Sequence, residues 1–190
     1  MTEPADRTGN ISQRQTFVRD DRKKIKITAD DHRCFSVMQT KIGKITLLAS
    51  EEYLLEIYLS EFNLSEFNNT ENRQNRVIKE AIRQLSAYFD QKLTVFDLPL
   101  KMNGTEFQNT VWTELKKIPY AETISYSELA NRIGNKKACR AVGMANSKNP
   151  FSIVVPCHRV IGANGTLTGY AGGLHLKREL LNFEMRANLF

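Results

Sequence analysis

Residues 105–134, TEFQNTVWTELKKIPYAETISYSELANRIG, set the layout of the second half of the chain. Thr105 and Gln108 form a capping-box pattern, in which each side chain is placed to bond the other's backbone at a helix start. The apolar positions that follow have helical spacing and end before Pro119, which stops the helix. They are Phe107, Val111, Leu115 and Ile118. The sequence therefore predicts a helix over 105–118.

The same stretch runs into a pair of short helices. Ser125 and Glu128 repeat the helix-start pattern, and Gly134 stops the short helix that they begin. A second helix is expected from about Lys136 to Ser147. Two short helices joined by a tight turn, the second of them basic, have the outline of a helix-turn-helix. Because many such pairs are plain packing units, the outline alone does not decide.

The second helix of the pair has two different sides. Small apolar residues predict the side that packs inward: Ala138, Ala141, Val142 and Ala145. Arg140 and Gly143 lie on the opposite side with Met144 and Ser147, by i, i+3 and i+4 spacing. Gly143 has two interpretations, close packing of two helices or close approach of a ligand to the backbone. Small side chains with one arginine suit a helix lying in a shallow, narrow groove.

The first half predicts a small sheet followed by a helix. Three β-prone runs, CFSVMQT, KITLLAS and YLLEIYLS, occupy 34–40, 44–50 and 53–60. A helical apolar face then follows at Ile78, Ala81, Ile82, Leu85 and Phe89. The segment 92–104 reads as a connection between two domains. We therefore expect an α/β protein with a mobile tail over 1–33, an N-terminal domain over 34–98 and a C-terminal domain over 99–190.

Composition excludes several classes of protein. An apolar share of 41% and a charged share of 25% are ordinary for a globular chain. No apolar run approaches the roughly 20 residues of a membrane span, and the N-terminus lacks the apolar core of a secretory signal. Three cysteines are an odd number, which argues against a disulfide framework. We expect an intracellular protein with reduced thiols and no membrane partner.

The net charge of +6 is concentrated in the second half. Residues 1–99 hold 15 basic and 15 acidic side chains, whereas residues 100–190 hold 12 and 6. Between Glu128 and Glu179 there is no acid, but there are eight bases. Such a stretch predicts a polyanionic partner.

The run FSIVVPCHRVIGANG, residues 151–165, places Cys157, His158 and Arg159 side by side. A buried thiol with incidental neighbours, a metal site and a nucleophile are the three interpretations. Metal binding fits poorly, because adjacent Cys and His do not have the usual spacing of two to four residues. The first half adds only His32 and Cys34. We expect no metal ion and no cofactor.

The motif PCHRVIG resembles the active-site signature of the O6-alkylguanine-DNA alkyltransferases. RAVGMANSKNP before it and GYAGGL after it continue the resemblance, which covers roughly residues 99–188. The resemblance implies an α/β, ribonuclease H-like N-terminal domain and a mainly helical, winged-helix-like C-terminal domain that carries a helix-turn-helix. It also implies that the protein flips O6-alkylguanine out of duplex DNA and transfers the alkyl group irreversibly to its own cysteine.

The resemblance assigns the catalytic residues. Cys157 matches the alkyl acceptor, and His158 matches the base that acts on it through a water. Glu184 matches the acid that orients the imidazole, and Asn149 matches the asparagine that braces the active-site turn. Arg159 is left with two interpretations, a structural ion pair or a phosphate contact.

Substrate and DNA contacts follow in the same way. Arg140 matches the arginine that replaces the extruded nucleotide, and Tyr126 the tyrosine that crowds the phosphate and bonds the flipped base. Tyr170 matches a residue of the alkyl pocket. The Val160 carbonyl, with that of Cys157, is expected to accept from the guanine amino group, and the Ala171 N–H to face O6. Gly143, Lys136 and Lys137 complete the expected DNA contacts.

Two other functions compete with this interpretation. A cysteine hydrolase shares the Cys/His/Glu set but leaves the basic helix pair without a role. A non-catalytic helix-turn-helix protein that binds alkylated or other DNA explains the charge but leaves PCHRV unused. The expected partner is double-stranded DNA carrying O6-alkylguanine, approached from the minor groove by a monomer. The compartment is the nucleus in a eukaryote and the cytoplasm in a prokaryote.

Overall fold

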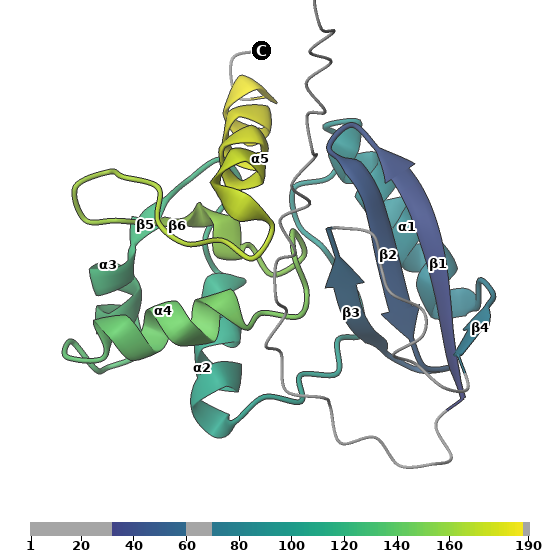
Figure 1. Ribbon diagram of the computed structural model, residues 1–190, viewed down its shortest axis with the longest axis horizontal. Coiled ribbons are helices and arrows are strands. Elements are labelled where there is room, and N and C mark those ends of the chain that lie inside the picture. The colour runs from purple at the N-terminus through teal and green to yellow at the C-terminus, as the bar shows by residue number, and fades with distance from the viewer. Residues whose placement is uncertain (1–31, 60–69, 188–190) are drawn as a thin grey trace, which may run out of the picture.

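The computed structural model describes residues 32–59 and 70–187. Nearly all of the expected tail over 1–33 lies outside these residues. Figure 1 shows a sheet-and-helix unit built from the first half of the chain beside a mainly helical unit built from the second half. An α/β protein with a small N-terminal sheet and a helical C-terminal part is therefore confirmed.

The N-terminal unit is a four-stranded sheet covered on one face by a helix. The strands are β1 (Arg33–Thr40), β2 (Gly43–Ala49), β3 (Leu54–Tyr58) and β4 (Thr70–Asn72), in the order β3-β2-β1-β4. β1 pairs antiparallel with β2, and β2 with β3, whereas β4 pairs parallel with β1. The first three strands confirm the predicted runs. β4 was not predicted, because a three-residue TEN segment carries no apolar alternation.

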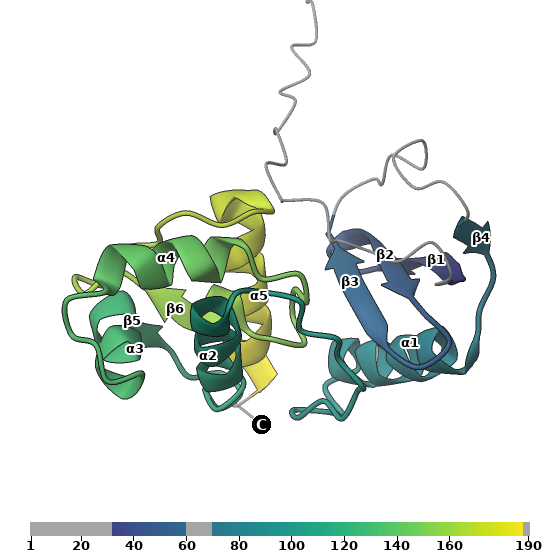
Figure 2. The ribbon, with the colours of Figure 1, turned by 90° about the horizontal axis from the view of Figure 1, so that it is seen from below.

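Helix α1 (Arg76–Phe89) packs on the sheet, as Figure 2 shows. Its start is fixed by Asn75, whose side chain accepts from the Ile78 N–H and donates to the Ser50 carbonyl at 2.7 Å. Val77, Ile78, Ala81, Leu85 and Tyr88 form its buried face. The cap thus joins the helix to the sheet at the point where the apolar face begins.

Helix α2 (Glu106–Leu115) has the predicted capping box between Thr105 and Gln108. It ends at Leu115, three residues before the predicted end. The Lys117 and Ile118 amides bond three residues back, to Glu114 and Leu115, in a tighter turn. Pro119 disfavours the α conformation of the residue before it, which explains the early end.

Helices α3 (Tyr126–Arg132) and α4 (Cys139–Ser147) are the predicted pair. The Ser125 side chain caps α3, but the Glu128 carboxylate pairs with Arg132 at 3.0 Å instead of closing a capping box. Gly134 has a φ of 77°, which a glycine tolerates and most residues do not. α4 begins at Cys139 and not near Lys136, because the chain first makes a turn from Asn135 to Ala138.

The inner side of α4 differs from the prediction at two positions. Val142 and Ala145 are buried as expected, but Ala141 is exposed and Asn146 is buried in its place. The Trp112 indole on α2 donates to the Ala145 carbonyl at 2.9 Å, which fixes the two helices against each other.

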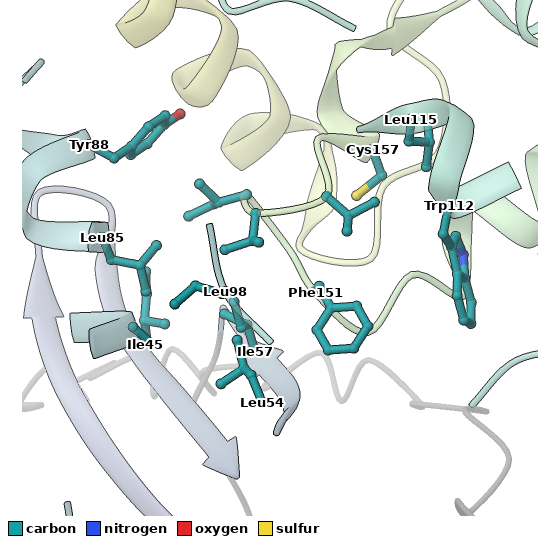
Figure 3. Close-up of a cluster of buried hydrophobic side chains, with 14 of the residues drawn as sticks. Ile45, Leu54, Ile57, Leu85, Tyr88, Leu98, Trp112, Leu115, Phe151 and Cys157 are labelled. Carbon is teal, nitrogen blue, oxygen red and sulfur yellow. The ribbon is translucent and has the colours of Figure 1, made fainter. Parts of the chain in front are cut away.

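The two halves share one apolar core, part of which is shown in Figure 3. The edge strand β3 is covered by the second half: Leu54 bridges to Leu100, and Ile57 bridges to Phe151. The Ile57 amide donates to the Pro150 carbonyl at 2.8 Å. The first half therefore supports the segment that leads to Cys157. In the part of the chain that the structure describes, no helix has the length and apolar character that crossing a membrane requires.

Candidate active site

The segment before Cys157 is held in a strained turn. Ile153 has a φ of 72°, which is unfavourable for a β-branched residue and is tolerated only where the surroundings impose it. Asn149 supplies part of that constraint: its side chain donates to the Val155 carbonyl at 2.7 Å and accepts from the Phe151 amide at 3.0 Å. Both bonds are buried. One amide side chain thus closes the turn from both ends.

Cys157 opens a short 3₁₀ turn, η2 (Cys157–Arg159), that leads into strand β6 (Val160–Ile161). β6 pairs with β5 (Ile124–Ser125), which directly precedes α3. The thiol is only 4% exposed. Burial raises the pKa of Cys157, although Asn149 and the charge of Lys177 act in the opposite direction. At neutral pH the resting side chain is a thiol, and it needs a base before it can act as a nucleophile.

That base is adjacent in sequence and is fixed from the last helix, α5 (Gly173–Ala187). His158 Nε2 lies 2.9 Å from Glu184 Oε1, and both side chains are completely buried. Burial by itself would raise the pKa of Glu184, but hydrogen bonds and charges from His158 and Arg159 hold it well below its usual value. An ionised Glu184 accepts from Nε2–H, so the neutral imidazole presents Nδ1 as its free acceptor.

His158 is suited to accept a proton from a nearby thiol. Burial lowers the pKa of His158, with Glu184 acting in the opposite direction, so the ring is neutral at pH 7. Its Nδ1 atom is buried and has no hydrogen-bond partner among the described residues. A thiol, an imidazole with an open nitrogen and an ionised carboxylate form the nucleophile–base–orienter series of a cysteine-dependent reaction.

Arg159 forms the structural ion pair that was one of its two interpretations. Its Nε and Nη2 atoms donate to Glu184 Oε2 and Oε1, both at 2.9 Å, and Nη1 donates to the Ile118 carbonyl. Arg159 is 4% exposed. Removing one partner of a buried pair costs about 3–5 kcal/mol, because the other charge stays buried and uncompensated. The motif therefore places the base and the counter-ion of one carboxylate next to each other.

The helix pair lies beside this centre. Tyr126 begins α3 and is half-buried, and its ring lies 5.7 Å from Lys177 Nζ. A Cβ placed on Gly143 of α4 would meet the Tyr126 ring at 3.8 Å, an ordinary contact. Arg140 is exposed in the first turn of α4. Lys136 and Lys137, also exposed, lie in the turn before that helix.

Comparisons with known proteins agree over both halves of the chain. Residues 106–186 match the family model described as the 6-O-methylguanine DNA methyltransferase DNA binding domain, and residues 34–102 match the ribonuclease-like domain of the same protein. The methylated-DNA–protein-cysteine methyltransferase of Methanosarcina acetivorans is 48% identical over 151 residues, which cover 79% of this chain and 97% of that protein. The chain belongs to the 6-O-methylguanine DNA methyltransferase family.

Further relatives and solved structures support the same family. The protein of that name from Mycolicibacterium paratuberculosis is 47% identical over 80% of this chain and 92% of its own length. The crystal structure of Mycobacterium tuberculosis OGT in complex with DNA superposes with a TM-score of 0.73 and 42% identity, covering 81% of this chain and 94% of that one. The crystal structure of the methyltransferase from Pyrococcus kodakaraensis gives a TM-score of 0.59 and 25% identity, covering 79% of this chain and 98% of that one.

The remaining residues expected from the family lie around the thiol or in the loop beside it. Tyr170 is half-buried, and its buried hydroxyl lies next to Cys157 and Ser152. Burial raises the pKa of Tyr170 well above its usual value, and Cys157 acts in the same direction. Ala171 is exposed directly before α5. Within the described residues, no group of three His, Cys, Asp or Glu side chains could hold a metal ion.

The carbonyls expected to contact the base already have internal donors. Asn146 Nδ2 donates to the Cys157 carbonyl at 3.3 Å, and Lys177 Nζ donates to the Val160 carbonyl at 2.6 Å. Because a carbonyl oxygen has two lone pairs, each can accept a second bond from a ligand. Asn146 and Lys177 thus hold these acceptors in place.

Lys177, like Asn146, is a site residue that the sequence analysis did not identify. It is completely buried, and it also donates to the Thr168 carbonyl at 3.0 Å, which joins α5 to the loop after β6. Burial lowers the pKa of Lys177 to about 8. Spacing offered a signal, because Lys177, Leu180 and Glu184 lie at i, i+3 and i+7 on one helix face. A lysine within that apolar face indicates a specific buried partner.

Proposed function

We propose that the protein repairs O6-alkylguanine in double-stranded DNA by moving the alkyl group onto its own Cys157. The observation that carries the proposal is the arrangement at the thiol. Cys157 is buried next to a neutral His158 whose Nε2 is bound to Glu184 and whose Nδ1 is free. Relatives with 47–48% identity are named for cysteine methyl transfer from methylated DNA.

The proposed reaction is a single displacement. The Cys157 proton passes to His158 Nδ1, through a water in the mechanism of the family. The thiolate sulfur then attacks the alkyl carbon. The carbon–O6 bond breaks as the sulfur–carbon bond forms, and the departing guanine base takes up a proton to become guanine. The product is a thioether on Cys157, which has no route back to a thiol. Each molecule therefore reacts once.

The site residues have distinct proposed roles. Glu184 orients His158 and stabilises its charged form, and Asn149 holds the turn that positions the sulfur. Tyr126 bonds the flipped base, Tyr170 lines the alkyl pocket, and the Ala171 N–H faces O6. The carbonyls of Val160 and Cys157 read the guanine amino group. An enzyme acting at O6 has to remove the base from the stack, because the duplex covers that atom.

DNA binding is assigned to α3 and α4. Arg140 enters the space left by the flipped nucleotide from the minor groove, while Gly143 allows the helix to approach closely. Lys136 and Lys137 contact phosphates. The proposed unit is a monomer, with domain boundaries at 34–98 and 99–190, acting in the nucleus of a eukaryote or the cytoplasm of a prokaryote. The relatives named above come from archaea and mycobacteria.

An intact-mass measurement tests the proposal. Mixing the protein with duplex DNA containing O6-methylguanine is expected to add one methyl group to Cys157, in a ratio of one per molecule. Cys157→Ala is expected to gain no mass and to retain DNA binding. Release of a free methylated product with turnover would indicate a hydrolytic enzyme. DNA binding without any adduct would indicate the non-catalytic helix-turn-helix protein.

A further inference from the structure

One of the hydrogen bonds that the Glu184 carboxylate accepts comes from the N-terminal half of the molecule. Tyr88, near the end of α1, donates its hydroxyl to Glu184 Oε1 at 2.8 Å, and the bond is buried. The other donors to this carboxylate, His158, Arg159 and the Ala121 amide, belong to the C-terminal half. Glu184 Oε1 therefore accepts from His158, from Arg159 Nη2 and from Tyr88.

Tyr88 is fixed by its surroundings. It is completely buried. Its ring lies 5.2–6.0 Å from four other rings, those of Phe89, Phe96, Tyr120 and Phe183. In Figure 3 the ring extends from its helix with the hydroxyl directed toward α5. A side chain held on all sides has little rotamer freedom, so it presents its donor in one place at little further entropic cost.

Tyr88 has the character of a permanent donor. Burial, followed by the charge of Glu184, raises the pKa of Tyr88 far above its usual value, so the phenol keeps its proton. A hydrogen bond to the charged form of a carboxylate favours that form and withdraws part of its charge. The strength of the Tyr88 bond therefore affects how strongly Glu184 stabilises a protonated His158.

We propose that Tyr88 is a positioning residue of the alkyl-transfer site, supplied by the N-terminal unit, which sets the orientation and the charge of Glu184 toward His158. The inference rests on the function proposed above. It gives the first half of the chain a direct part in the chemistry, in addition to the support that β3 gives to the segment before Cys157.

Other groups also act on this pair. Arg159 on η2 and Lys177 on α5 lower the pKa of His158, whereas Glu184 raises it. Tyr120, from the connection between α2 and β5, lies near Glu184, and its own hydroxyl is buried without a partner among the described residues. Among the residues that the structure describes, Tyr88 alone donates a hydrogen bond to the Glu184 carboxylate from the N-terminal unit. A variant at Tyr88 leaves the charged groups in place, so its effect reports on this bond.

The test compares Tyr88→Phe with the matched variant Tyr120→Phe. Tyr120 is in the same aromatic cluster, with its ring centroid 6.0 Å from that of Tyr88. Its hydroxyl has no hydrogen-bond partner among the described residues. The rate of single-turnover methyl transfer from O6-methylguanine duplex DNA is measured from about pH 5.5 to 9. We expect Tyr88→Phe to lower the maximal rate on the order of tenfold, the lower end of the effect of removing a group that orients a metal-binding histidine. Tyr120→Phe is expected to match the wild type.

The midpoint of the pH profile separates positioning from general packing. Without the Tyr88 donor, Glu184 keeps more of its charge and stabilises protonated His158 more strongly, which raises the pKa of His158. The acidic limb of the profile is therefore expected to move to higher pH. Incorporating 3-fluorotyrosine at position 88 makes the phenol a stronger donor and is expected to move the limb to lower pH. The protein with 3-fluorotyrosine keeps the packing of the ring. It therefore tests the role of the Tyr88 hydrogen bond even if Tyr88→Phe does not fold.

The outcomes that overturn the inference are distinct from those that overturn the function. Wild-type protein that transfers no methyl group rejects the proposed function itself. Wild-type transfer with an unchanged rate in Tyr88→Phe rejects the role of Tyr88 alone. A lower rate with an unmoved midpoint in Tyr88→Phe shows a packing effect and rejects the role of Tyr88. An unmoved midpoint in the 3-fluorotyrosine protein shows that the Tyr88 bond does not act on His158 and rejects it as well.

Discussion

His158 and Arg159 share one carboxylate, that of Glu184, and all three side chains are almost completely buried. The ion pair with Arg159 keeps Glu184 ionised, and an ionised Glu184 fixes the tautomer of His158. The adjacent residues of the motif therefore depend on each other through a residue on another element. Because of this dependence, acid is expected to affect both the stability of the fold and the alkyl-transfer reaction.

The free energy of unfolding is expected to fall as the pH decreases below about 6.5. Burial lowers the pKa of His158 from its ordinary value of 6.5, so in this range the unfolded chain binds a proton that the folded chain does not. Below about 4.5 the same argument applies to Glu184, whose folded pKa is also depressed. Urea unfolding at pH 7 and pH 5 measures the first effect.

His175 provides the control for this measurement. Its side chain is 86% exposed on α5, so His175→Gln is expected to keep the wild-type difference in stability between pH 7 and pH 5. His158→Gln is expected to reduce that difference, whatever its stability at pH 7. An equal difference in all three proteins would show that His158 does not stay neutral in the fold.

At the scale of elements, α4 combines a packed side with an open one. The open side includes Gly143, which packing does not require: a Cβ there would meet Tyr126 at an ordinary distance of 3.8 Å. Glycine inside a helix costs roughly 0.5–1 kcal/mol relative to alanine. The fold therefore bears a cost that its own contacts do not explain, and close approach of DNA is the remaining interpretation.

Gly143→Ala is accordingly expected to raise the free energy of unfolding, by up to about 1 kcal/mol, while it weakens binding to duplex DNA. Thermal unfolding and fluorescence anisotropy with labelled duplex measure the two effects. Ser86→Ala, at an exposed position of α1 in the N-terminal unit, controls for a change in helix propensity alone and is expected to leave affinity unchanged. A destabilised Gly143→Ala protein would instead show that this glycine serves helix packing.

At the scale of the whole molecule, charge is divided between the interior and the surface. Two of the eight bases between Glu128 and Glu179, Arg159 and Lys177, are buried with internal partners. The other six lie on the surface or are half-buried: Arg132, Lys136, Lys137, Arg140, Lys148 and Arg178. The basic surface is thus smaller than the sequence indicates, and it includes the helix pair.

DNA affinity is expected to fall steeply with salt, because bound lysines and arginines release counterions from phosphates. Lys136→Ala and Lys137→Ala are each expected to reduce the slope of log affinity against log salt by about 1. Lys79→Ala, exposed on α1 in the charge-balanced half, is expected to leave the slope unchanged. Titrations at several salt concentrations measure the slopes, and an effect of Lys79 equal to that of Lys136 would argue against binding through the helix pair.

Local signals in the sequence identified most of the elements. Thr105, Ser125 and Gly134 mark helix ends through bonds and angles within a few residues, so their effect can be read along the chain. The strands of the first half and the face of α1 follow from periodicity. The cysteine motif also identified the family, because its residues are contiguous.

Only the tertiary structure decided which distant groups meet. Glu184 lies 96 residues after Tyr88 and 25 residues after Arg159 in the sequence, and no local pattern pairs it with either of them. Burial of Lys177 and Asn146, the short strand β4, and the late start of α4 likewise depend on what packs against them. Helix caps and periodicity act over three or four residues, whereas a buried charge or hydroxyl is stable only where folding brings a partner to it.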